Sequence, residues 1–130
     1  NPVFHLATVE GNQPRVRQMF LYKADESGIM FHTGTWKDVY KQISQNNKVE
    51  LCFSCNGVQI RISGELGLID DNDLKDEISE HPTRKFLKAW REKGMYKDFY
   101  KEMAVYILQN GTAVAWTMDK NFAPKEEVQL

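Results

Sequence analysis

Residues 49–69 read VELCFSCNGVQIRISGELGLI, and this stretch decides the fold. Its centre is the pair Asn56-Gly57, which between two strand-like runs is the strongest short-range signal for a β-hairpin. In the five residues after the turn, apolar and polar side chains alternate, as in a strand with one buried face. The stretch therefore predicts two antiparallel strands, over residues 49–55 and 58–69.

Five more strand-like runs lie on either side of this hairpin: residues 3–9, 15–22, 29–33, 104–108 and 113–118. The first three have tight connections, which favours an antiparallel meander. A second Asn-Gly pair, at Asn110, predicts a hairpin between the last two, and Gly64 and Gly67 indicate bends or bulges. We expect a mainly β fold with peripheral helices, a small barrel or sandwich of six to seven antiparallel strands, in a single domain over residues 1–130.

Helical patterns interrupt the strands twice. Residues 33–35 open a helix that runs to about Asn46. Its apolar stripe has helical spacing and consists of Trp36, Val39, Tyr40 and Ile43. Further on, an acidic run caps a helix over residues 74–80. Pro82 suits the first turn of another helix, which ends at Gly94.

The composition excludes several functional classes. The 130 residues carry 17 Lys and Arg against 18 Asp and Glu, so bulk charge provides no basic surface for nucleic acid. The chain is 42% apolar with a net charge of −1, unlike a disordered protein. No apolar run approaches the roughly 20 residues of a membrane span, and no signal sequence opens the chain. We expect a cytoplasmic protein without nucleic-acid or membrane partners.

Cys52 and Cys55 have the C-x-x-C spacing of some metal and redox sites. They fall within a predicted strand, where residues three apart point to opposite faces, and no second pair completes a four-ligand site. We therefore expect two small, buried, reduced cysteines and no metal site.

The clearest candidate binding site is the stretch TGTWK, residues 33–37, which follows a strand and opens a helix. Backbone N–H groups at a helix N-terminus form an anion site, and Gly34 lets a ligand approach the backbone closely. Lys37 is unfavourable in a first helical turn unless a bound phosphate reverses its interaction with the helix dipole. The alternative is a solvated lysine beside an ordinary threonine cap.

Other candidate residues are polar or aromatic groups on strands. Arg15 and Arg17 share a strand face with Met19, which fits either a solvated edge or a planar polar ligand beside the strand. By local sequence alone, Gln59 is an exposed polar residue and Trp116 a core or interface aromatic. No nucleophile–base pair and no metal-spaced cluster is visible, so any redox chemistry would belong to a cofactor.

Taken in order, these segments resemble the pyridoxamine 5′-phosphate oxidase-related split-barrel flavoproteins. The matching residues include RQMFLY (17–22), DESGIMFHT (25–33), Lys37, and Gln59 ahead of ISGE (62–65). The helical insert and short tail are similar to the small branch that includes nitroimidazole-resistance-type proteins. The family implies an FMN-binding split β-barrel that forms a homodimer with the flavin at its interface.

By position, the resemblance assigns eight cofactor-binding residues: Arg17, Gln18, Met19, His32, Thr33, Lys37, Gln59 and Trp116. Residues 17–19 would line the flavin ring and ribityl chain, and Lys37 would bind the phosphate. Gln59 would reach the flavin from the neighbouring subunit. The family's additional phosphate-binding arginine is replaced here by Trp36.

The resemblance implies an FMN-dependent oxidoreductase that acts on a small organic substrate, with nitroaromatics as candidates and no catalytic residue assigned. The oxidase's substrate-binding His and Arg do not follow Trp116, so we expect a reaction other than pyridoxamine 5′-phosphate oxidation. Several alternatives stay open. They are a flavin-binding or sensing protein without turnover, a split barrel that binds a deazaflavin or haem, with His5 and His32 as candidate ligands, and a purely structural barrel.

Overall fold

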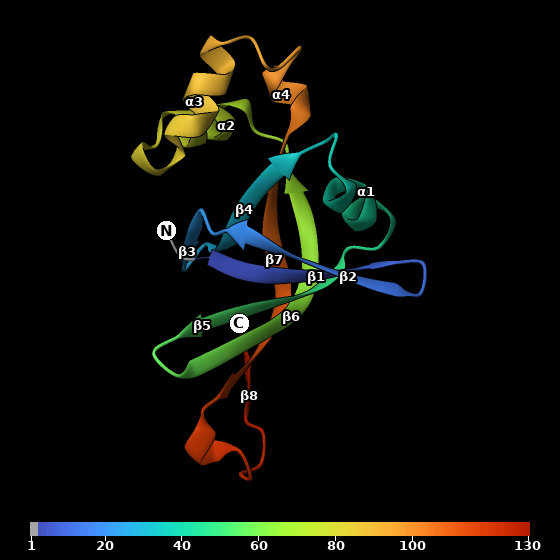
Figure 1. Ribbon diagram of the computed structural model, residues 1–130, viewed down its shortest axis with the longest axis vertical. Helices are drawn as coiled ribbons and strands as arrows, with labels where there is room; N and C mark the ends of the chain where they lie inside the picture. The colour runs from blue at the N-terminus through green and yellow to red at the C-terminus, as the bar shows by residue number, and fades with distance from the viewer. Residues whose placement is uncertain (1–2) are drawn as a thin grey trace.

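The computed structural model describes residues 3–130, which form one eight-stranded antiparallel sheet (Figure 1). The strand order is β2-β1-β5-β6-β7-β4-β3, with β8 paired to β7. The strands are β1 (Val3–Glu10), β2 (Gln13–Phe20), β3 (Lys23–Asp25), β4 (Gly28–Gly34), β5 (Lys48–Cys55), β6 (Val58–Ile69), β7 (Met103–Trp116) and β8 (Glu127–Gln129). The mainly β prediction is confirmed, and the short strands β3 and β8 raise the number above the expected six to seven.

The central hairpin forms as predicted from β5 and β6. Asn56 and Gly57 have φ angles of 50° and 80°, the left-handed values that a type I′ turn requires at both central residues. Further along the hairpin, Leu51 is paired with Ile62, and both side chains are buried. The alternating pattern therefore fixes which face of the hairpin meets the core.

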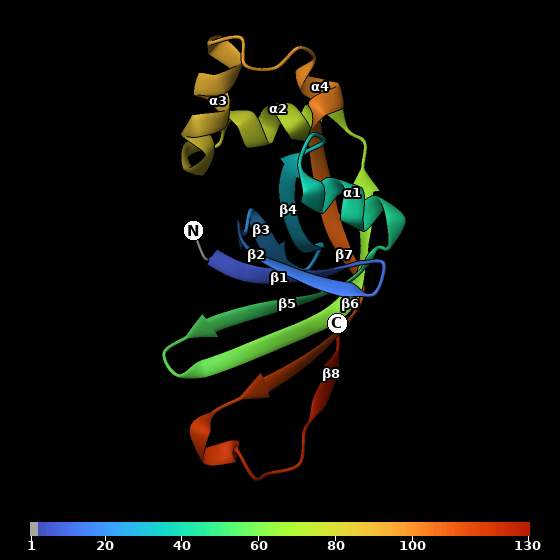
Figure 2. The same ribbon diagram turned by 45° about the vertical axis from the view of Figure 1, so that its right-hand side comes forward.

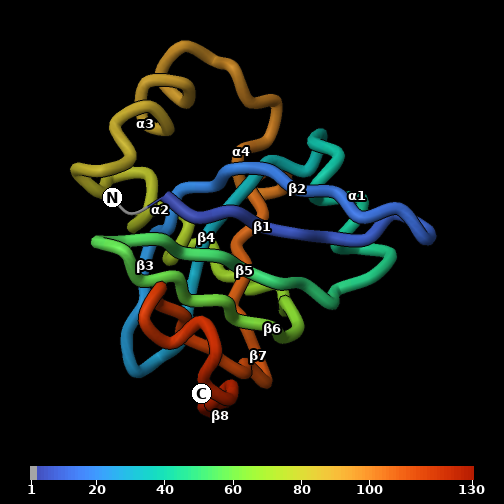
Figure 3. Tube along the Cα trace, turned by 60° about the horizontal axis from the view of Figure 1, so that its bottom comes forward, coloured from blue at the N-terminus to red at the C-terminus, as the bar shows by residue number. Residues whose placement is uncertain are grey.

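The predicted meander of the first three strands is wrong. β1 and β2 form a hairpin, but β4 pairs with β7 rather than with β2. Only Leu21 and Tyr22 separate β2 from β3, although these strands stand at opposite ends of the strand order. The sheet must therefore curl until its two ends meet, as the tube in Figure 3 shows. No ladder joins β2 to β3 or β4 in the described part of the chain, so the barrel is split there.

The last two predicted strands are one continuous strand, β7, so the hairpin predicted at Asn110 is wrong. Of that Asn-Gly pair only Asn110 has a positive φ, 55°, whereas a type I′ turn needs two such residues. The register between β6 and β7 shifts opposite this point, between Ser63 and Glu65, so the strand bulges instead of turning. Gly64 lies in the shift, as predicted, because a Cβ there would be 2.8 Å from the Gln109 carbonyl oxygen.

Helix α1 (Asp38–Gln45) begins later than the sequence predicts. β4 stays paired with β7 as far as Gly34, and Lys37 then occupies the N-cap position of the helix. Trp36 therefore precedes the helix and is not part of its buried stripe. Its ring instead covers Gly34, where a Cβ would collide with it.

A helical insert lies between β6 and β7 and covers one end of the barrel (Figure 2). It consists of α2 (Asn72–Glu80), the 3-10 turn η1 (Pro82–Arg84), α3 (Lys85–Glu92) and α4 (Phe99–Glu102). Asp71 caps α2 as predicted, because its carboxylate accepts the N–H groups of Asp73 and Leu74. Gly94 follows α3 with a φ of 71°, which suits the end of a helix.

Two hydrophobic cores result. The barrel core includes Phe4 and Phe31, both fully buried, with ring centroids 5.2 Å apart. The second core lies between the insert and the barrel and centres on Ile78. Leu21 belongs to the first core, whereas its neighbour Tyr22 packs against the second. The link between β2 and β3 thus contacts both cores.

The two cysteines are both free. Cys52 is half-buried, but Cys55 is exposed beside the hairpin turn, so the prediction that both are buried is wrong. Within residues 3–130 no three His, Cys, Asp or Glu side chains form a potential metal cluster. None of the helices in that range has the length and apolar character to span a bilayer.

We expect Gly64→Ala to lower the free energy of unfolding by about 1–3 kcal/mol, because the new Cβ would meet backbone fixed by the bulge. Gly67→Ala in the same strand is the matched control. There the Cβ would meet the movable end of the Gln109 side chain at 3.1 Å, and we expect a change below about 1 kcal/mol. Urea unfolding measures both values. Equal losses would contradict the bulge argument.

Candidate functional site

A cavity of about 590 Å³ opens where the barrel is split, between β2 and β4. Its walls come from these two strands, the start of α1 and the insert, and most of the lining is apolar with a few polar groups. Both the volume and the lining are typical of small-molecule sites.

Six of the eight residues predicted as cofactor-binding line this cavity: Arg17, Gln18, Met19, His32, Thr33 and Lys37. The first three lie on β2, the next two on β4, and the last at the N-cap of α1. β2 and β4 are not paired with each other, so only the curl of the sheet brings these segments together.

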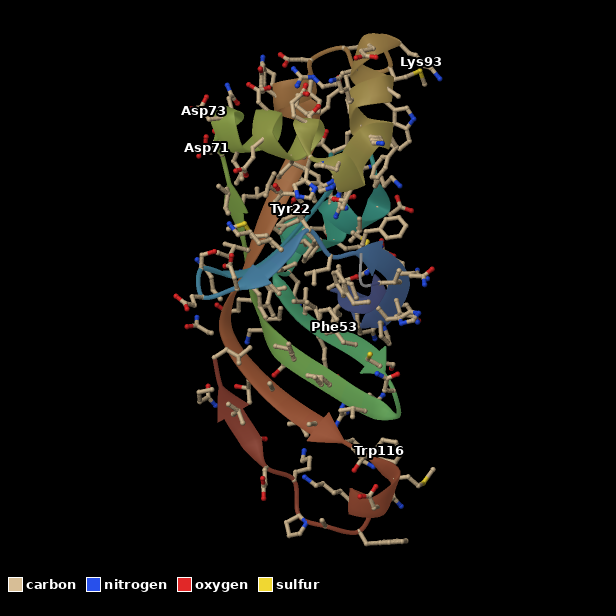
Figure 4. The ribbon with its side chains drawn as sticks, turned by 90° about the vertical axis from the view of Figure 1, so that its left-hand side faces the viewer. Tyr22, Phe53, Asp71, Asp73, Lys93 and Trp116 are labelled. Carbon is tan, nitrogen blue, oxygen red and sulfur yellow. The ribbon has the colours of Figure 1, made fainter. Side chains whose placement is uncertain are left out.

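Gln59 and Trp116 lie in a second hollow, of about 510 Å³. They are cross-strand partners on β6 and β7, and Figure 4 shows Trp116 far from Tyr22, at the opposite end of the molecule from the insert. Gln59 Nε2 lies 3.4 Å from Cys52 Sγ, and Trp116 Nε1 donates to Asn121 Oδ1 at 3.2 Å. Within one chain these two residues therefore do not border the first cavity.

The Lys37 end of the cavity is positively charged. No side chain caps α1, and the Lys37 backbone N–H donates to the Gly34 carbonyl at 3.1 Å. Among residues 3–130, no carboxylate lies within 4.0 Å of the Lys37 ammonium. A free cation beside an uncapped helix N-terminus favours an anion at this end.

Arg17 belongs to a buried polar network under α1. Its Nη1 donates to Thr8 Oγ1 at 2.8 Å and to the Leu6 carbonyl at 3.2 Å, and its Nη2 donates to Gln42 Oε1. Thr8 Oγ1 also donates to Gln42 Oε1, at 2.7 Å. Burial lowers the pKa of Arg17, and Asp38 partly offsets this, so the group stays charged. Arg17 thus fixes α1, and with it Lys37, against the barrel.

His32 is held by an arginine from the insert. Arg84 Nε donates to His32 Nε2 at 2.8 Å, and Arg84 Nη2 donates to the Leu21 carbonyl at 2.9 Å. Arg84 itself is fully buried. Burial, together with the Arg84 charge, lowers the pKa of His32 to about 3, so the imidazole is neutral at physiological pH.

Aromatic side chains form the outer wall of the cavity. Trp36 packs against Tyr96 with ring centroids 5.9 Å apart, and Phe86 packs against Trp90 at 5.2 Å. Trp36 and Trp90 remain 53% and 42% exposed. Such a wall can stack against a planar ligand.

Sequence reasoning missed Arg84 and most of the aromatic wall. Arg84 lies 52 residues from His32, and no local pattern marks it as a partner of a strand residue. The insert aromatics have ordinary helical spacing and read as core. Trp36 was predicted to belong to the apolar stripe of the helix, and it lines the cavity instead because α1 begins later, at Asp38.

The fold is a split barrel with a cavity at the split, and the comparison with family models identifies the same fold family. Residues 1–108 match the model PNPOx_N, pyridoxamine 5′-phosphate oxidase. The chain belongs to this family, which confirms the resemblance drawn from the sequence.

Solved structures share the whole fold. A NimC/NimA family protein from Clostridium acetobutylicum has a TM-score of 0.76 at 28% identity, covering 99% of this chain and 85% of that one. A pyridoxamine 5′-phosphate oxidase-related, FMN-binding protein from Nostoc punctiforme has a TM-score of 0.70 at 18% identity, covering 99% and 87%. A haem-binding protein from Mycobacterium smegmatis has a TM-score of 0.67 at 11% identity, covering 98% and 52%. The last two likenesses show the fold alone.

Curated relatives are longer proteins. The pyridoxine/pyridoxamine 5′-phosphate oxidase of Agrobacterium fabrum is 29% identical over 91 residues, which are 68% of this chain and 44% of that protein. The chain thus spans less than half the length of the curated relatives that it matches, and their activity does not transfer directly.

We expect the free energy of unfolding to decrease as the pH is lowered below 6.5, because of His32. Between pH 6.5 and about 3 the unfolded chain binds a proton on this residue that the folded chain does not. The free energy of unfolding then drops by about 1.4 kcal/mol per pH unit in that window, and His32 makes no pH-dependent contribution above it. Urea unfolding should show that wild type loses about 2 kcal/mol more than His32→Gln between pH 7 and 5. Parallel pH profiles would refute a neutral His32 held by Arg84.

Proposed function

We propose that the cavity binds FMN and that the chain is a flavin-dependent oxidoreductase for a small organic substrate, with nitroaromatics among the candidates. The observation that carries this proposal is the convergence of residues 17–19, His32, Thr33 and Lys37 on one cavity at the split of the barrel. Family membership and an FMN-binding protein of the same fold support it.

The cavity fits FMN in size and charge. FMN joins a planar ring to a phosphate dianion. Lys37 and the uncapped start of α1 would hold the phosphate, with the Thr33 hydroxyl as a further donor. The apolar lining would enclose the ring. The bound flavin would supply the electron transfer, and the chain would bind and orient it.

β2 is suited to forming hydrogen bonds with the edge of a heteroaromatic ring. It stands at the end of the strand order, so one row of its backbone N–H and C=O groups has no ladder partner. Gln18 and Met19 lie on this strand and line the cavity. Arg17 keeps its charge close to the cavity while its donors hold the Thr8–Gln42 network, so its main contribution would be electrostatic.

A second copy of the chain would complete the site. Gln59 and Trp116 are remote from the cavity within one chain, so they can reach its ligand only from a partner. Val58 and Ile60, on the predicted apolar face of β6, are 36% and 38% exposed, and Phe20 on β2 is 55% exposed. We assign these uncovered apolar residues to a homodimer interface.

The geometry favours flavin over haem. His32 Nε2 is occupied by Arg84, and a buried cation beside the ring opposes binding to iron. His5 is exposed on β1 and does not itself line the cavity. The haem-binding relative shares only the fold.

The direct test is the absorption spectrum of the purified protein and its titration with FMN. We expect a flavin spectrum, anaerobic reduction by NADH or NADPH, and reoxidation by a nitroaromatic acceptor. Flavin binding without reoxidation would favour a storage or sensing protein. A Soret band would favour haem, and a colourless protein that takes up no FMN would overturn the proposal.

Lys37→Ala should weaken FMN binding about 10- to 100-fold, because a charge-assisted contact to phosphate is lost. Lys41→Ala is the matched control, since Lys41 is an exposed lysine of the same helix outside the cavity. It should change the Kd less than about twofold. Riboflavin, which lacks the phosphate, should bind both variants alike. A Lys37→Ala protein with unchanged FMN affinity would contradict the phosphate assignment.

Ile60→Glu should convert a dimer to a monomer and reduce FMN binding, because it places a charge in the proposed interface. Leu68→Glu provides a control on the same strand at a residue that is 58% exposed. Light scattering coupled to gel filtration measures the mass of each variant. A wild-type monomer that binds FMN normally would refute the shared site.

A further inference from the structure

Arg84 is a fully buried arginine with no acidic partner. Its Nε donates to His32 Nε2, its Nη2 to the Leu21 carbonyl, and its Nη1 to the carbonyl and hydroxyl oxygens of Thr83 at 3.3 and 3.2 Å. Every acceptor is neutral. Among residues 3–130 no carboxylate lies within 4.0 Å of the guanidinium. Burying a charge without a counter-charge costs free energy of folding, which indicates that Arg84 has a functional role.

The hydrogen bond between Arg84 and His32 determines where the histidine proton lies. A guanidinium only donates and keeps its protons at any ordinary pH, so His32 Nε2 must accept. The neutral ring then carries its proton on Nδ1. No residue of the described chain is hydrogen-bonded to Nδ1, and Nδ1 is not among the buried unpaired atoms. His32 also lines the cavity, so its Nδ1–H is a donor available to a ligand.

We propose that Arg84 is a positioning residue of the cavity, which locks His32 as an Nδ1–H donor toward an electron-rich acceptor atom of the bound ligand. The proposal rests on the proposed function, with flavin as the ligand. It extends that function to the insert, because Arg84 contacts His32, which lines the cavity, and does not itself line it.

The same arrangement defines the chemistry that His32 selects. A donor with a buried cation behind it favours an acceptor that carries or gains negative charge. A ligand donor at this point would face the Nδ1 proton and would be rejected. His32 is therefore assigned to hydrogen bonding rather than to proton transfer, because Arg84 opposes its protonation.

Nitrogen-15 NMR of histidine-labelled protein tests, without any ligand, whether Arg84 fixes the tautomer of His32. We expect the Nδ1-protonated tautomer at His32 in the wild-type protein and a mixture of tautomers in Arg84→Met. Arg91→Met is the matched control, because Arg91 lies in the same insert and binds Asp76 but does not touch His32. It should leave the tautomer unchanged. An Nε2-protonated His32 in the wild type would overturn the proposal.

FMN titrations of the single and double variants, compared as a double-mutant cycle, test whether His32 contacts the ligand and Arg84 acts through it. Arg84→Met and His32→Phe should each weaken binding by up to about tenfold, the upper end of the usual range for one neutral hydrogen bond. Adding Arg84→Met to His32→Phe should then change the Kd less than about twofold, because Arg84 acts through His32. An equal loss in both backgrounds would show a merely structural arginine and would overturn the proposal.

Two further results separate the role of Arg84 from the question of whether the protein binds flavin. If Arg84→Met does not fold, Arg84→Lys can be used instead. It retains the charge without the Nε donor, and we still expect a mixture of His32 tautomers. Unchanged FMN affinity in His32→Phe would reject the histidine contact while leaving flavin binding intact. If the wild-type protein takes up no FMN, the proposed function fails and the ligand contact with it, whereas the tautomer still decides the role of Arg84.

Discussion

Leu21 and Tyr22 join two strands that stand at opposite ends of the sheet, and the rest of the structure depends on this short connection. Two residues cannot span an open sheet, so the sheet has to curl and bring β2 to the side of β4. The Tyr22 N–H extends the β3–β4 ladder by donating to Met30, and the Leu21 carbonyl accepts from Arg84. The same link closes the barrel, anchors the insert and opens the cavity at the split.

The electrostatics of the cavity follow from two arginines, one half-buried and one fully buried, whose side chains donate to neutral groups. Arg17 and Arg84 both donate to neutral acceptors, and within residues 3–130 no carboxylate lies within 4.0 Å of the Lys37 ammonium. The net charge of −1 gives no hint of this local excess of positive charge. Because low-dielectric surroundings strengthen the field of unpaired charges, an anionic or electron-rich ligand gains most here. This preference does not depend on which ligand occupies the cavity.

Local signals predicted those features that local forces decide. Asn56-Gly57 turns because both residues take positive φ angles, and Asp71 caps α2 through its nearest N–H groups. The same dipeptide at Asn110 fails as a turn signal because pairing along the 14 residues of β7 outweighs it. Pairing of β4 as far as Gly34 likewise delays α1. In the site, residues 17–19, His32, Thr33 and Lys37 were assigned through the family resemblance, and the structure places them on one cavity.

Contacts between the two cores could not be predicted from the sequence. Arg84 meets His32 across 52 residues, and the aromatic wall pairs Trp36, from the barrel side, with Tyr96 of the insert. The barrel supplies the cavity's polar and charged groups, whereas the insert, with its own core around Ile78, adds to the apolar wall the side chains of Phe86, Leu87, Trp90 and Tyr96. Because the two sets of residues rest on separately packed cores, changes in the insert can alter which planar molecule fits without disturbing the barrel groups. The exception is Arg84, through which the insert acts on a polar group of the barrel.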